Sequence, residues 1–135
     1  MINNAIQTKL VTIRGWEVML DRDLADLLNM ETKRLLERCK RNENIFDIND
    51  YFQLSNDELI TLRSQIATAN NEINLSMKSR VLPYAFTING IELLKIIFKK
   101  PDQMDMLETI LLVFDGYCNS NESTDIEVNN QLILY

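Results

Sequence analysis

Hydrophobic and polar residues alternate in two short stretches near the start of the chain, at residues 9–14 and 16–20. A period of two is typical of β-strands that bury one face. Gly15 separates the stretches, and a glycine between alternating segments favours a tight turn. The pattern therefore predicts a small β-hairpin, or two short strands, over residues 9–20.

After residue 20 the apolar positions move to the spacing of helices. Leu24, Leu27 and Leu28 share one face of a helix that we expect to begin with Asp21 as its N-cap and to end near Leu28. A second helix is expected from Glu31 or Thr32 to about Arg41. Its buried side is expected to consist of Leu35, Leu36 and Cys39.

Asn29 lies between these two helices. Among residues other than glycine, asparagine tolerates left-handed backbone geometry best, and a tight reversal between helices needs that geometry. Met30 follows as an apolar residue that can pack the turn inward. Two short helices joined in this way, with cations on the second, are typical of a helix-turn-helix.

The rest of the chain alternates short extended segments with helices. We expect a strand at residues 51–54, a helix over residues 55–68 opened by a capping box of Ser55 and Glu58, and a loop at residues 69–79. Residues 80–87 read as an extended segment that Pro83 confines to a sheet edge. Two further helices are expected at residues 91–98, deeply buried, and 101–117.

These elements predict an α+β fold that is mostly helical. It combines a helix-turn-helix with a short β-hairpin and small antiparallel strands, and has about five helices. We expect one domain over residues 1–118 and a polar C-terminal tail with an apolar end over residues 119–135. The wide apolar coverage of the last helix favours packing on two sides or against a second protomer. A homodimer through this helix is therefore expected.

Charge is distributed unevenly along the chain. The first 42 residues carry eight Lys or Arg and six acids, whereas residues 43–135 carry six and fourteen, which gives the net charge of −6. No Lys or Arg occurs from Pro101 onward. Such a chain can meet nucleic acid only through one face.

The composition also excludes several kinds of chemistry. The chain has no histidine and only two cysteines, Cys39 and Cys118, so a Cys/His zinc site and a catalytic triad cannot be built. It has no phosphate-binding glycine loop. We therefore expect no enzyme, no cofactor and no metal. With no apolar run of membrane-spanning length and no signal peptide, the expected location is the cytoplasm.

Four separated blocks of sequence resemble the ORF-six N-terminal domain family, a phage and prophage group allied to the KilA-N and Bro-N domains. The blocks are residues 12–15 with 18–25, residues 31–35 with 40–42, residues 52–55 with 62–68, and residues 82–87 with Gly90. Together they extend over roughly residues 10–115. The resemblance implies a DNA-binding domain of the kind found at the N-terminus of phage antirepressors and related regulators. It therefore also implies that the expected cytoplasm is that of a bacterial host cell.

The candidate DNA-binding residues lie mainly on the second helix of the predicted motif. Thr32, Lys33 and Arg34 are expected nearest the bases, Arg38 on the same exposed side, and Lys40 and Arg41 at phosphates. A solvated helix face is the alternative interpretation. Arg63 and Gln65 form a second candidate patch, or else an ordinary helix surface. Lys78 and Arg80 flank the predicted loop and are candidates for a minor groove or phosphates.

A competing hypothesis concerns the acidic half of the chain. It proposes a phage-encoded inhibitor of a host protein, a defence nuclease or a repressor, that mimics nucleic acid. The face expected to bind the protein partner consists of Asp102, Asp105, Glu108 and Asp115.

Overall fold

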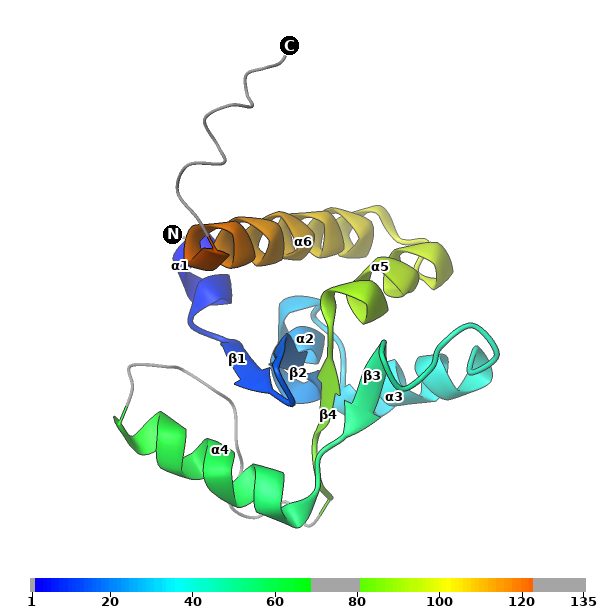
Figure 1. The fold of residues 1–135 in the computed structure, drawn as a ribbon. Coiled ribbons are helices and arrows are strands. Elements are labelled where there is room, and N and C mark those ends of the chain that lie inside the picture. The colour runs from blue at the N-terminus through cyan, green and yellow to red at the C-terminus, as the bar shows by residue number, and fades with distance from the viewer. Residues whose placement is uncertain (1, 69–80, 123–135) are drawn as a thin grey trace.

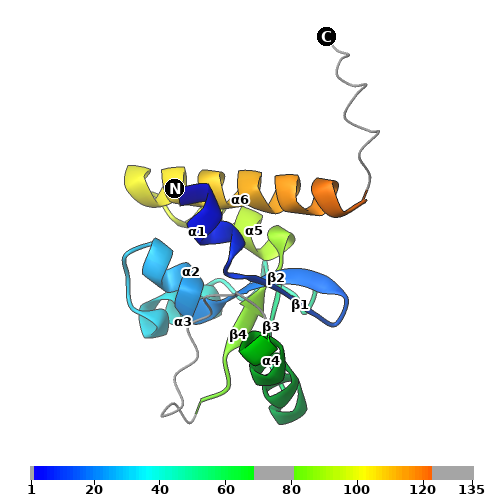
Figure 2. The same cartoon turned by 90° about the vertical axis from the view of Figure 1, so that its left-hand side faces the viewer.

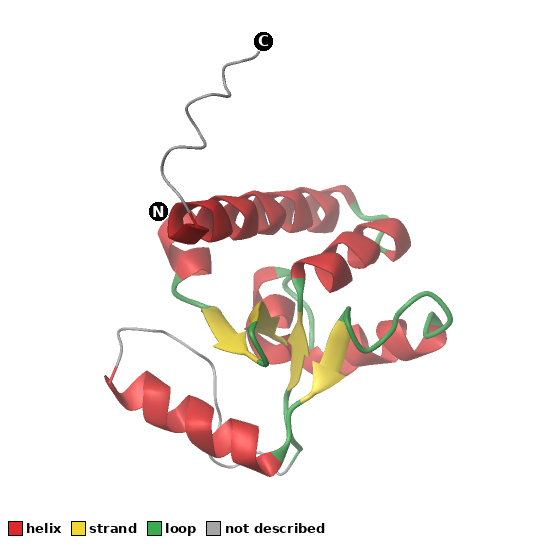
Figure 3. Cartoon of the chain, in the orientation of Figure 1, coloured by secondary structure: helices red, strands yellow, loops and turns green. Residues whose placement is uncertain are grey.

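The computed structural model describes residues 2–68 and 81–122, which form six helices around a four-stranded sheet (Figures 1 and 3). The elements follow in the order α1 (Ile2–Gln7), β1 (Leu10–Ile13), β2 (Trp16–Leu20), α2 (Asp21–Leu27), α3 (Thr32–Arg41), β3 (Tyr51–Gln53), α4 (Asn56–Thr68), β4 (Tyr84–Phe86), α5 (Ile88–Ile97) and α6 (Pro101–Glu122). The expected α+β class is confirmed. The loop predicted at residues 69–79 lies outside the described residues.

The predicted hairpin is formed by β1 and β2. Ile13 pairs with Trp16, so only Arg14 and Gly15 lie between the strands. Both have left-handed backbones, with φ values of 58° and 80°. Positive φ at both central residues is the mark of a type I′ turn, whose twist matches that of the flanking strands. Gly15 reaches this geometry without strain, whereas Arg14 does so at a cost that the hairpin offsets.

The sheet is antiparallel, with the order β1-β2-β4-β3. The segment around Pro83 was expected at a sheet edge, and this prediction is wrong, because β4 lies between β2 and β3. Pro83 has no backbone N–H, but it lies before the paired residues of β4. No hydrogen bond of the ladder therefore depends on it as a donor. Its carbonyl is used instead, accepting a hydrogen bond from the Leu54 N–H at 2.9 Å.

The two faces of the sheet belong to different cores. On one face Leu10, Met19 and Phe86 join a large cluster with side chains of α1, α2, α3, α5 and α6. On the other face Val18, Ala85 and neighbouring strand residues pack with Leu62 of α4. Figures 1 and 2 show α4 below the sheet, away from the other five helices. The sheet therefore separates α4 from α2 and α3.

Helices α4 and α5 begin with side-chain caps. Ser55 and Glu58 form the expected capping box, since the Ser55 N–H donates to Glu58 Oε1 at 2.8 Å and the Glu58 N–H donates to Ser55 Oγ at 3.1 Å. Thr87 caps α5 through a hydrogen bond that its hydroxyl accepts from the Gly90 N–H. The apolar run of α5 is less buried than expected, because Ile96 is 59% exposed.

Helices α1 and α6 lie together across the top of the molecule in Figure 1. The sequence predicted no helix at residues 2–7, yet Ile6 of α1 is fully buried in the main core. Helix α6 continues to Glu122, past the expected end near residue 117 and into the segment expected to be a polar tail. Among the described residues, none of the helices is long and apolar enough to cross a bilayer.

Candidate nucleic-acid interface

The connection between α2 and α3 is a tight reversal centred on Asn29, whose φ is 58°. The Asn29 N–H donates to Asp26 O at 3.1 Å, and the Met30 N–H donates to Ala25 O at 3.0 Å. This pair of bonds is a Schellman motif, which satisfies the last carbonyls of α2 and ends the helix. The predicted turn at Asn29 is confirmed, and Met30 packs against the main core as expected.

Asp21 is the first residue of α2, but it does not cap the helix as predicted. The N-cap is Leu20, which has no side chain able to do so. The Asp21 carboxylate is buried and instead accepts a hydrogen bond from the Tyr84 N–H at 3.1 Å. Burial raises the pKa of this carboxyl, more than the Tyr84 N–H and the nearby Arg22 lower it. The side chain thus ties α2 to β4.

The inner side of α3 holds the motif together. Leu35 and Cys39 are fully buried in the main core, and Leu36 packs against it from a half-buried position. Burial raises the pKa of the Cys39 thiol to about 12, so the group stays protonated and unreactive near neutral pH. This cysteine is a small core residue.

The outer side of α3 carries exposed cations. Lys33, Arg34, Lys40 and Arg41 are exposed, and Thr32 is half-buried at the start of the helix. Arg34 lies 3.6 Å from Glu31, but both side chains are about three-quarters exposed, at 74% and 77%, so this pair restrains Arg34 weakly. These four cations are therefore available to a ligand.

Arg38 differs from the other cations of α3 because it contacts α5. Its guanidinium carbon lies 4.8 Å from the centre of the Phe98 ring, and its Nη1 donates to Ile97 O at 3.4 Å. A cation above an aromatic face is attracted by the ring. Arg38 therefore positions α3 against the end of α5, in addition to any contact with a ligand.

Two grooves flank the exposed ridge of α3. The first, which we call the cationic groove, lies between α3 and the start of α6 and has a volume of about 400 Å³. Its basic residues are Arg34, Arg38, Arg41 and Lys100, and its acids are Glu31 and Glu37.

The second groove, which we call the apolar groove, has a volume of about 490 Å³. Leu36, Val81 and Leu82 line it together with Lys33, Lys40 and Arg22. Lys100 and Arg22 were not predicted as candidates. They reach α3 only through tertiary packing, and no local sequence signal marks them.

The other predicted candidates do not join this surface. Arg63 and Gln65 lie on α4, on the opposite side of the sheet from α3. Lys78 and Arg80 lie outside the described residues. Within the described part of the chain, the predicted cations other than Arg63 therefore lie on α3.

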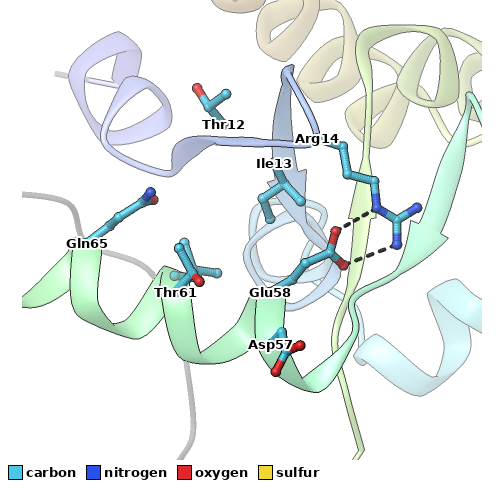
Figure 4. A pocket seen from close by; sticks show the side chains of 8 residues that line it. Thr12, Ile13, Arg14, Asp57, Glu58, Thr61 and Gln65 are labelled. Carbon is cyan, nitrogen blue, oxygen red and sulfur yellow. Dashed lines mark hydrogen bonds and ion pairs between the residues drawn. The ribbon is translucent and has the colours of Figure 1, made fainter.

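A third pocket, of about 210 Å³, lies between the hairpin and α4 (Figure 4). There Arg14 forms two hydrogen bonds to Glu58, at 2.6 Å and 3.1 Å, and its guanidinium lies 4.0 Å from the centre of the Phe52 ring. The hydrogen bond lowers the pKa of Glu58 and raises that of Arg14. These contacts connect the type I′ turn to the capping box of α4. The charged residues around the pocket therefore stabilise the packing of the hairpin on α4.

The four acids of the competing hypothesis are all exposed on α6, at Asp102, Asp105, Glu108 and Asp115. Glu108 forms an ion pair with Lys95 of α5. The structure thus places the candidate acidic face on a different element from the candidate cations.

Residues 2–68 and 81–122 contain no cluster of three or more His, Cys, Asp or Glu that could hold a metal ion. Comparison with known proteins gives one family match, to the ORF6N domain over residues 8–97. No match is found among curated proteins or solved structures. The matched region contains the hairpin, α2, α3, α4 and α5, and it is two thirds of the chain. The chain therefore belongs to the ORF6N domain family, a phage-associated group regarded as DNA-binding regulators and not known as enzymes.

Proposed function

We propose that this protein binds duplex DNA through α3 and acts as a phage or prophage regulator of the antirepressor type. The observation that carries the proposal is the row of exposed cations on a helix that follows a Schellman turn. A second helix held in this way is the element that a helix-turn-helix inserts into the major groove. Membership of the ORF6N family supports the same conclusion.

The positions along α3 suggest a division of roles. Residues at the N-terminal end of a recognition helix contact base edges, and Arg34 can form a bidentate contact with guanine. Thr32 and Lys33 are its neighbours in this role. Lys40 and Arg41, one to two turns further on, are placed for phosphates, which position the helix without reading sequence.

One motif of this size binds weakly, so we propose a homodimer that occupies two half-sites about 34 Å apart. Helix α6 supplies the contact surface. Met104 and Leu112 on this helix are 38% and 68% exposed, so both apolar side chains are available to a second protomer. Burying them against a second α6 removes them from water.

The test measures the affinity for duplex DNA as a function of salt concentration. It includes two variants that are expected to change this affinity in opposite directions. Arg34→Glu removes a cation whose side chain is 74% exposed, so the fold should persist while affinity is lost. Glu37→Gln removes an exposed acid from the same ridge and should raise affinity. Affinity of the unchanged protein should fall steeply with salt. Absence of measurable binding to any duplex at low salt would refute the proposal.

A second candidate function is inhibition of a host protein that normally binds nucleic acid. Its support is the exposed acidic face of α6, where Asp102, Asp105 and Asp115 repeat along a helix that carries no Lys or Arg. Neutralising Asp102, Asp105 and Glu108 should then abolish capture of a host protein from lysate. The capture should survive nuclease treatment, whereas capture that depends on nucleic acid should not.

A further inference from the structure

The cationic groove combines side chains from two parts of the chain that are far apart in sequence. Arg34, Arg38 and Arg41 come from α3 and share one side of that helix, since they are spaced four and three residues apart. Lys100 comes from the residue that precedes α6. Figures 1 and 2 both show the start of α6 on the same side of the molecule as α2 and α3.

The start of α6 contacts the turn of the helix-turn-helix through Gln103. Gln103 donates a hydrogen bond from its Nε2 to Leu28 O at 3.4 Å, and the same nitrogen lies 3.8 Å from the sulfur of Met30. Both partners belong to the turn between α2 and α3. The Met104 N–H donates to Lys100 O at 2.9 Å, which fixes the backbone of Lys100 to the first turn of α6.

Lys99 and Lys100 are neighbours with different surroundings. The Lys99 ammonium donates to Ile96 O at 2.8 Å, at the end of α5, and this residue does not line the cationic groove. Lys100 is exposed and lines the groove together with the arginines of α3. The groove thus has four cations and two carboxylates, one of which, Glu31, already pairs with Arg34.

We infer that the cationic groove binds a backbone phosphate of the DNA duplex through Arg38 and Arg41, while Arg34 contacts the bases, and that Lys100 completes the phosphate contact from outside the recognition helix. This inference rests on the function proposed above. An excess of cations in a concave site of about 400 Å³ suits a phosphodiester, whose oxygens can meet Arg and Lys donors from two sides. The cationic groove runs beside α3. When a recognition helix lies in the major groove of DNA, backbone phosphates lie on either side of that helix.

Lys100 lies beyond residue 97, where the match to the ORF6N domain ends. The consequence is that a residue outside the matched region contributes to DNA binding. Gln103 of α6 connects the segment that follows Lys100 to the turn before α3.

The experiment compares Lys100→Gln with Lys99→Gln in the full chain. Both remove one positive charge at adjacent positions, so they change the net charge equally. Duplex affinity is measured at several salt concentrations from 50 to 200 mM, with a matched series in which inorganic phosphate replaces part of the chloride at equal ionic strength. Circular dichroism checks that both variants are folded.

Loss of one phosphate contact should lower the salt slope by about one, so the fall in affinity from 50 to 200 mM should be about 3.5-fold smaller for Lys100→Gln. Lys99→Gln should keep the slope of the unchanged protein, and Lys100→Arg should restore it. Equal slopes for both glutamine variants would overturn the inference while leaving the proposed function intact. A different outcome is that inorganic phosphate competes with DNA in the unchanged protein and not in Lys100→Gln, while the salt slope of DNA binding is the same for both. That outcome would assign the groove to free phosphate and would also overturn the inference. No duplex binding by the unchanged protein would refute both.

Discussion

Replacement of Gly90 by alanine should destabilise the fold, because the new methyl group would enter the backbone of a neighbouring segment. Gly90 lies in the first turn of α5, directly against the residue that precedes β3. A Cβ built there would lie 2.1 Å from Asp50 O and 2.9 Å from Asp50 C. Ordinary contacts begin at 3.4 Å, so the two segments would have to separate by 3.4 minus 2.1, or 1.3 Å.

The hydrogen bonds that this separation would break determine how large the effect is. Asp50 O accepts a hydrogen bond from the Thr87 N–H at 3.0 Å, and the Thr87 hydroxyl donates to Asn49 O at 2.8 Å. Losing one buried hydrogen bond costs about 1 kcal/mol, and forcing extra volume into a packed site costs about 1–3 kcal/mol. Alanine regains up to about 1 kcal/mol through its helix propensity. The net loss should be about 2 kcal/mol, which lowers the Tm by about 8 °C for a chain of this length.

Gly116→Ala is the matched control, since it makes the same change in α6, where a Cβ would meet nothing within 4 Å. This variant should keep or raise the stability, by up to about 1 kcal/mol. Thermal and urea unfolding of the two variants measures the difference. If Gly90→Ala were as stable as the unchanged protein while Gly116→Ala behaved as expected, the close approach of α5 to Asp50 would be wrong.

Three further predictions concern local contacts. Asn29→Ala should cost about 1 kcal/mol in urea unfolding because alanine resists a φ of 58°, whereas Asn29→Gly should be tolerated. Ser55→Ala should cost about 1 kcal/mol by the same assay, since it removes the hydroxyl half of the capping box. Because the pKa of Asp21 is raised in the folded protein, its contribution to the free energy of unfolding is greatest when the carboxyl is protonated. This contribution is lost as the pH rises through the pKa of the folded state. Asp21→Asn should therefore gain in Tm relative to the unchanged protein between pH 3 and pH 7, and an advantage that shrinks with rising pH would contradict this reasoning.

The elements that sequence predicted well are those with local signals. The alternation around Gly15, the asparagine at the helix reversal and the Ser55–Glu58 pair each encode their geometry within a few residues. Such signals need no knowledge of the rest of the fold. The family resemblance and the exposed cations of α3 came from the same kind of contiguous pattern.

The predictions that failed, and the features that were missed, depend on residues far apart in the chain. Asp21 has the chemistry of an N-cap, but the Tyr84 N–H competes for its carboxylate across the sheet. Helix α1 has too few residues to show a period, and it is stabilised by packing against α6. The placement of Lys100 beside α3 requires the whole path through α5 and the turn into α6. Sequence therefore indicated which helix carries the cations, but not what lies beside it.

The direction of α6 explains how an acidic chain can present a basic face. This helix begins beside the cationic groove, where Lys100 and Gln103 lie, and runs away from it over α1 (Figures 1 and 2). From Asp102 to Asp115 it rises about 20 Å, so its acids are progressively more distant from α3. A separation of this size exceeds the screening length of about 8 Å at physiological salt, so the far acids hardly weaken the positive potential around the cations of α3.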